Sequence, residues 1–125
     1  MNALPVLVVE DSFLIAASLE DALLEAGHTV SLAASVADAE ALLATTGFSA
    51  ALLDFMLPDG DSLDLARRLH ANGCKVAVVS GADRDVVPAD PAIAAHFAKP
   101  LDDRVLVDWV RSIGWKDLTH PVSES

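Results

Sequence analysis

Short apolar runs alternate along the chain with longer segments in which apolar residues recur every three to four positions. The short runs predict buried β-strands, and the longer segments predict amphipathic helices. Strands are expected near residues 5–9, 28–33, 50–53, 76–79 and 94–98. Helices are expected near residues 12–26, 36–46, 62–72 and 102–113, with a doubtful one between 84 and 95. Alternating strands and helices are typical of an α/β fold built on a parallel sheet.

Residues that start and stop helices support these boundaries. The first helix is expected to start at Ser12, and Ser35 precedes the second, where its hydroxyl can accept a hydrogen bond from a first-turn amide. Gly27 and the pair Asn72-Gly73 follow the first and third helices, and Gly114 is expected to stop the last one. The pattern therefore predicts one domain over residues 1–114 and a flexible tail over residues 115–125.

The doubtful helix lies in the stretch RDVVPADPAIA. Pro88 and Pro91 each lack an amide donor, and each disfavours helix at the preceding residue. A fourth helix is therefore expected to be short or irregular, and this segment is expected to rearrange easily.

Composition and charge narrow the function classes. The chain has 125 residues, is 53% hydrophobic and carries a formal net charge of −11, which suits one globular domain that binds neither nucleic acid nor anionic membranes. The single cysteine, Cys74, cannot form an internal disulfide, and its position predicts a small, partly buried residue before a strand. No basic leader or membrane-length apolar run is visible, so a soluble, cytoplasmic protein is expected.

Polar residues follow four of the expected strands at the point where each strand ends. These residues are Glu10-Asp11, Asp54, Ser80-Gly81 and Lys99 before Pro100. Because the carboxyl ends of parallel strands meet at one edge of the sheet, we expect these side chains to converge there. The predicted cluster contains carboxylates, a hydroxyl and an ammonium group, which is the composition of a site that accepts a phosphoryl group.

Each residue type has a chemical reason to be in such a site. The carboxylates of Glu10, Asp11 and Asp54 suit Mg²⁺, which prefers oxygen ligands, and the Pro-Asp-Gly turn after Asp54 is expected to bring the Met56 carbonyl near the metal. Asp54 is the expected nucleophile because it ends the central strand. The transferred group is expected to contact the ammonium of Lys99 and, as hydrogen-bond donors, the Ser80 hydroxyl and the Met56 and Gly81 amides.

The segments VLVVEDS, LLDFMLPDGDSLDLARRL, VAVVSG and AKPLDD resemble the motifs of response regulator receiver domains of bacterial two-component signalling. The resemblance covers residues 4–113 and implies a flavodoxin-like sheet with strand order 2-1-3-4-5. It implies that Asp54 is the phosphoacceptor and that Asp11, rather than Glu10, is the direct Mg²⁺ ligand. It also implies that Lys99, before a proline bond that is often cis, binds phosphate, and that Ser80 is the switch hydroxyl.

One departure from the family pattern affects the switch. The position where the family often has an aromatic residue is His96, with Phe97 one residue later. His96 is therefore a candidate switch residue together with Ser80, although an exposed strand residue is the alternative. The largest change on activation is expected between Gly81 and Ala98.

The resemblance implies a stand-alone receiver, monomeric or weakly dimeric, that takes its phosphoryl group from a histidine kinase or histidine phosphotransfer protein and signals to a downstream protein. No enzyme activity beyond self-phosphorylation and self-dephosphorylation of Asp54 is implied. Two alternatives remain open, an aspartyl-phosphate phosphohydrolase and a binding module that works without phosphorylation. The other histidines, His28, His70 and His120, lack metal-ligand spacing and are expected at the surface, and Trp109 is expected to pack.

Overall fold

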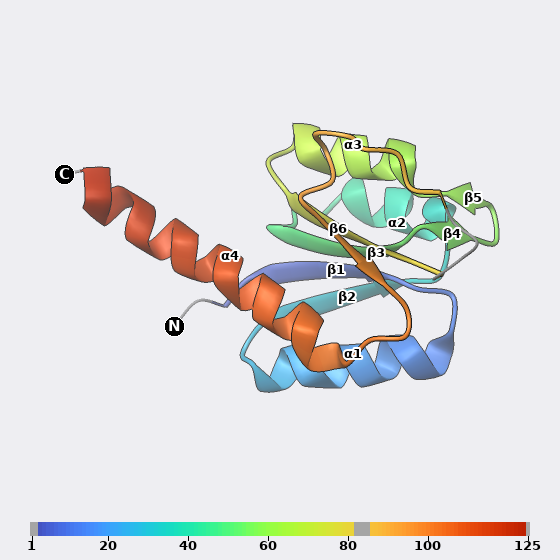
Figure 1. Ribbon diagram of the computed structural model, residues 1–125, viewed down its shortest axis with the longest axis horizontal. Helices are drawn as coiled ribbons and strands as arrows, with labels where there is room; N and C mark the ends of the chain where they lie inside the picture. Colours follow the sequence, from blue (N-terminus) through green and yellow to red (C-terminus); the bar gives the residue numbers. More distant parts are fainter. Residues whose placement is uncertain (1–2, 82–85, 125) are drawn as a thin grey trace.

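The computed structural model describes residues 3–81 and 86–124, with side chains described as far as Ile113. Five parallel strands form the central sheet in the order β2-β1-β3-β6-β7 (Figure 1). The strands are β1 (Pro5–Val9), β2 (Thr29–Ala33), β3 (Ala50–Asp54), β6 (Lys75–Ser80) and β7 (Ala95–Ala98). This order confirms the predicted 2-1-3-4-5 arrangement of a flavodoxin-like α/β fold.

Helices cover both faces of the sheet (Figure 1). Helices α1 (Phe13–Glu25) and α4 (Asp103–Glu124) lie on one face, and α2 (Val36–Leu43) and α3 (Leu63–Ala71) lie on the other. Successive strand residues point to opposite faces, so each face has its own core. Leu52 belongs to the core under α1 and α4, whereas Leu53 belongs to the core under α2 and α3.

The residues expected to start and stop helices predicted the boundaries of three of the four helices to within a few residues. The Ser12 hydroxyl accepts a hydrogen bond from the Ile15 amide, and α1 ends just before Gly27, whose φ of 96° is in the left-handed region that glycine tolerates. Gly73 follows α3 in the same conformation, with a φ of 87°.

The predicted end of the last helix is wrong. Helix α4 continues through Gly114 to Glu124, and Figure 1 shows its carboxyl-terminal part extending away from the sheet. A glycine inside a helix costs only about 1 kcal/mol relative to alanine, so it ends a helix reliably only where the chain also turns into the left-handed conformation.

A small feature missing from the sequence prediction follows β3 directly. Strands β4 (Met56–Leu57) and β5 (Gly60–Asp61) pair as a two-stranded antiparallel hairpin, with the predicted tight turn at Pro58 and Asp59. Strands of two residues leave no periodic pattern in a sequence, so only the turn was predictable. The hairpin lies at the carboxyl edge of the sheet, directly after the end of β3 (Figure 1).

The described part of the segment between β6 and β7 forms no helix over residues 86–94. Val87 and Ile93 instead pack against the core under α2 and α3, and the Arg67 guanidinium on α3 donates hydrogen bonds to the Asp90 carboxylate at 2.9 Å. The two prolines account for the absence of helix over residues 86–94, where a short or irregular helix was expected. Residues 82–85, where the doubtful helix was expected to begin, lie outside the described residues.

Cys74 and Trp109 both pack against the sheet, one fully buried and the other half-buried. Cys74 lies directly before β6 and is only 2% exposed, and burial raises the pKa of its thiol to about 12. Trp109 is half-buried on α4 and packs against the core under α1 and α4, as predicted.

Over the described residues, no helix has both the length and the apolar character that a membrane crossing requires.

The prediction that His28 lies at the surface is wrong. His28 directly precedes β2 and is 6% exposed, and its Nδ1 accepts a hydrogen bond from the Leu4 amide at 3.1 Å. His70, by contrast, is exposed as predicted. Burial, helped by the charge of Arg111, holds the pKa of His28 below its usual value.

Stability is therefore expected to depend on His28 in mild acid. The folded state favours the neutral form of His28. The contribution of His28 to the free energy of unfolding is therefore complete above the pKa of the unfolded state, about 6.5, and is lost as the pH falls through the lower pKa of the folded state. His28→Asn keeps an acceptor oxygen that cannot be protonated at this pH. Urea unfolding at about pH 7.5 and about pH 5 should show a smaller acid loss in the variant than in the wild-type protein. Equal losses would show that His28 does not contribute.

Candidate phosphoacceptor site

Three carboxylates converge at the carboxyl edge of the sheet. Glu10 follows β1, Asp11 is next to it, and Asp54 ends β3. One ligand oxygen from each lies within 4.8 Å of the other two. Glu10 and Asp54 are buried, whereas Asp11 is exposed. This donor set fits Mg²⁺, which takes one or two protein carboxylates and keeps several waters, because the exposed side leaves room for water.

Lys99 provides the positive charge of the site. Its Nζ lies 2.8 Å from Asp54 Oδ1 and 3.2 Å from Glu10 Oε1, and its backbone amide donates a hydrogen bond to the Ser80 carbonyl. The peptide bond between Lys99 and Pro100 is cis, as the family resemblance implied. One ammonium facing three carboxylates leaves an excess of negative charge that a divalent cation would neutralise.

The ionisation of the cluster reflects its burial. Burial raises the pKa of Asp54 to about 6, the neighbouring Glu10 carboxylate adds to the rise, and the hydrogen bond from Lys99 opposes it. Burial alone would lower the pKa of Lys99, but its contacts with Asp54 and Glu10 raise it above its usual value. At neutral pH the site therefore holds an ionised Asp54 and a charged Lys99.

Glu10 and Asp11 differ in what their carboxylates contact. Glu10 uses both oxygens within the protein, since Oε1 pairs with Lys99 and Oε2 accepts a hydrogen bond from the Ser12 amide at 2.9 Å. Asp11 is exposed to solvent beside this pair. The difference favours Asp11 over Glu10 as a direct metal ligand.

Ser80 and His96 form a hydrogen-bonded pair beside the cluster. Asp54 is opposite Val79 in the sheet register, so Ser80 lies one residue further along the neighbouring strand. The distance between Ser80 Oγ and His96 Nε2 is 2.7 Å. His96 is exposed on β7, and Gly81, the predicted amide donor, follows Ser80 directly. The sequence named both residues of the pair but not the contact between them.

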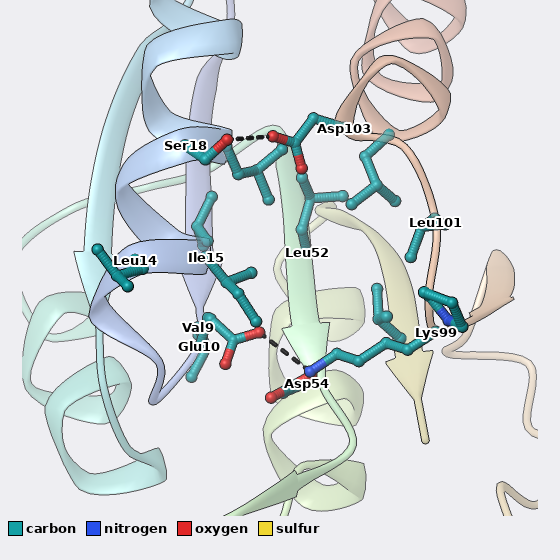
Figure 2. A pocket seen from close by; sticks show the side chains of 15 residues that line it. Val9, Glu10, Leu14, Ile15, Ser18, Leu52, Asp54, Lys99, Leu101 and Asp103 are labelled. Atoms are coloured by element: carbon teal, nitrogen blue, oxygen red, sulfur yellow. Dashed lines mark hydrogen bonds and ion pairs between the residues drawn. The ribbon is translucent and has the colours of Figure 1, made fainter. Parts of the chain in front are cut away.

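An apolar cavity opens beside the charged cluster, between α1 and the start of α4 (Figure 2). Its volume is about 380 Å³, and its apolar lining includes Ile15, Leu52 and Leu101. At the end away from Lys99, the Ser18 hydroxyl donates a 2.6 Å hydrogen bond to the Asp103 carboxylate. The sequence did not predict this Ser18–Asp103 contact, whose partners are 85 positions apart, because it depends on how two helices pack and not on the strand order.

Three large apolar side chains close to the cluster in the sequence are exposed. Phe13 and Leu14, on the first turn of α1, are 78% and 79% exposed, and Met56 is exposed on β4. These side chains lie two to four residues from Glu10, Asp11 or Asp54 in the sequence. Large exposed apolar side chains next to a reactive group are typical of a surface that contacts another protein.

Comparisons with known proteins agree with this geometry. Residues 6–111 match the response regulator receiver domain family. The chain is 31% identical over 86% of its length to the swarming motility regulation protein RssB of Serratia marcescens. It is 30% identical over 89% of its length to the TorCAD operon transcriptional regulatory protein TorR of Escherichia coli K12. These alignments cover 52% and 50% of those proteins, so the chain spans about half the length of the curated relatives it matches.

Solved structures show the same fold. A receiver domain described as CheY-like, from Methylobacillus flagellatus, superimposes with a TM-score of 0.78 at 28% sequence identity. The superposition covers 89% of this chain and 98% of that structure.

Proposed function

The chain belongs to the response regulator receiver family, and from that premise we propose that Asp54 accepts a phosphoryl group from a phosphohistidine of a two-component signalling partner. The observation that carries this proposal is the buried Asp54 carboxylate, held 2.8 Å from Lys99 within a cluster of carboxylates. A cytoplasmic location is part of the proposal, because the free buried thiol of Cys74 suits a reducing compartment.

The proposed transfer is a displacement at phosphorus. An oxygen of ionised Asp54 attacks the phosphorus atom, and the bond from phosphorus to the donor nitrogen breaks, with its electron pair leaving on the donor imidazole. Lys99, already in contact with Asp54, pairs with an oxygen of the transferred group. Mg²⁺ bound by Asp11, Asp54 and the Met56 carbonyl would supply the remaining neutralisation of charge.

The Ser80–His96 pair is the proposed link to a change in shape. Phosphorylation adds about −1.5 to −2 charge and three acceptor oxygens at Asp54. The Ser80 hydroxyl has one proton, so donating it to the phosphoryl group ends any donation to His96. We expect this exchange, together with the Gly81 amide, to shift the segment that leads through residues 86–94.

The partner that donates the phosphoryl group is proposed to be a histidine kinase or histidine phosphotransfer protein. Its phosphohistidine must reach Asp54 from the open side of the site, where Phe13, Leu14 and Met56 present apolar side chains. These three residues are therefore expected to contact the donor. Beyond self-phosphorylation and self-dephosphorylation of Asp54, no enzyme activity is proposed.

The proposal is tested with a small acyl phosphate as donor. Mass spectrometry should detect one added phosphoryl group in the presence of Mg²⁺ and none after EDTA treatment, and peptide mapping should place it on Asp54. Asp54→Asn should abolish the labelling, whereas Asp64→Asn, a matched change on the exposed surface of α3, should leave it intact. Labelling that survives EDTA or Asp54→Asn would refute the assignment.

A further inference from the structure

The first turn of α2 is capped from outside the helix. The Asp59 carboxylate, in the turn of the β4–β5 hairpin, accepts hydrogen bonds from the amides of Val36 and Ala37 at 2.9 and 3.0 Å. The Ser35 hydroxyl accepts the third amide, that of Asp38, at 3.1 Å. A helix leaves its first amides without partners, and a carboxylate is favoured at this positive end. The two amides hold the pKa of Asp59 below its usual value.

The hairpin that carries Asp59 is held at its base and at its tip. At the base, the Ser62 amide donates to the Phe55 carbonyl, and the Phe55 amide donates to the Val79 carbonyl on β6, both at 2.8 Å. At the tip, Leu57 is buried in the core, and the Asp59 contacts fix the direction of the turn. The backbone of Met56 lies between these two supports.

We propose that Asp59 is a positioning residue that couples the Met56 backbone to helix α2, so that Mg²⁺ and phosphoryl binding at Asp54 are transmitted to α2. The proposal rests on the proposed function, because it takes the Met56 carbonyl as a metal ligand. Asp59 lies three residues from Met56 and binds a helix that follows a different strand. A movement of the loop that optimises the Met56 carbonyl for the metal must therefore also act on the amides of Val36 and Ala37.

The coupling runs in both directions. The hairpin has only two residue pairs, Met56 with Asp61 and Leu57 with Gly60, so its own ladder fixes its orientation weakly. Hydrogen bonds from two amides to one charged carboxylate are stronger than bonds between neutral groups and, unlike the apolar packing of Leu57, they are directional. Removing them should loosen the Met56 carbonyl, and fixing that carbonyl with a metal should steady the first turn of α2.

Asp59→Asn tests this coupling, with Asp38→Asn as the matched control. Both changes remove one negative charge at the first turn of α2, but Asp38 is exposed and its carboxylate bonds to no other element among the described residues. The amide side chain in Asp59→Asn would offer one acceptor oxygen in place of two. Calorimetric titration with Mg²⁺ should show about 10-fold weaker binding for Asp59→Asn, a usual loss when the support of a metal ligand is removed. Asp38→Asn should stay within about twofold of the wild-type protein.

Hydrogen exchange supplies a second readout that does not depend on phosphotransfer. In the wild-type protein, Mg²⁺ with beryllofluoride should slow exchange of the Val36 and Ala37 amides, and Asp59→Asn should lose this protection while Asp38→Asn keeps it. Two results would overturn the coupling in a protein that still labels normally at Asp54. One is equal Mg²⁺ affinity of the two variants, and the other is an exchange rate of the α2 amides that Mg²⁺ and beryllofluoride do not change. If the wild-type protein itself fails to label at Asp54, the proposed function falls and the coupling falls with it.

Discussion

Lys99→Met is expected to lower the rate of Asp54 phosphorylation by about 100-fold, the usual effect of removing one group that stabilises charge in a transition state. The same change should leave Mg²⁺ affinity equal to or tighter than that of the wild-type protein. The reason is that the Lys99 ammonium lies 2.8 Å from Asp54 and 3.2 Å from Glu10, where it competes with a cation for the same carboxylates. Phosphorylation rates with an acyl phosphate and Mg²⁺ titrations measure the two effects separately.

Lys75→Met is the control for this experiment. Lys75 is exposed at the start of β6, at the opposite end of the strand from Ser80, so its loss changes the net charge equally without touching the site. Both its rate and its Mg²⁺ affinity should match the wild-type protein. A parallel loss of rate and affinity in Lys99→Met would contradict the role given to Lys99.

Asp11→Asn is expected to weaken Mg²⁺ binding by about 10-fold or more, whereas Glu10→Gln should weaken it only a few-fold. Two unit charges about 4 Å apart near a protein surface attract by about 4 kcal/mol, and a third of that energy is already about tenfold in affinity. Asp11 is exposed and can offer its oxygens to a metal, whereas both Glu10 oxygens are engaged by Lys99 and the Ser12 amide.

Calorimetric titration of both variants at the same ionic strength measures the difference. Thermal unfolding without Mg²⁺ serves as the control, because Glu10 is buried and its replacement can also change stability. A larger loss of affinity for Glu10→Gln than for Asp11→Asn, in variants of normal stability, would reverse the two roles.

The sheet and most of the site were predictable because strong signals coincide in the sequence. Asp54 and Lys99 each come at the end of an apolar run, and a parallel sheet brings such positions to one edge whatever their separation in the chain. Their convergence follows from the topology, and the structure shows it as a contact of 2.8 Å. Pro88 and Pro91 were also informative, because each restricts the backbone locally. No helix forms over residues 86–94.

Contacts that depend on how loops and helices sit on the sheet were not predictable. Asp59 bonds to residues 22 and 23 positions away, His28 to a residue 24 positions away, and Ser18 to one 85 positions away. The Pro-Asp-Gly pattern marks Asp59 as a turn residue, but nothing in the sequence points to the amides of α2 as its partners. A histidine at an expected strand start likewise looks exposed until its partner amide is known. Gly114 misled for a different reason, because a glycine only weakens a helix.

Because Cys74 is buried, the reactivity of its thiol reports local unfolding around the start of β6. Its thiol is the only one in the sequence, is 2% exposed, and has a pKa of about 12, so reactive thiolate is almost absent from the folded state. A thiol reagent can therefore modify only molecules in which the region around the start of β6 has opened. The rate of modification under native conditions measures how often this region opens, and no denaturant is needed. The rate of Cys74 modification can be compared between the wild-type protein and every variant described above. A variant with an unchanged rate has a damaged site, whereas a variant with a faster rate has a less stable fold.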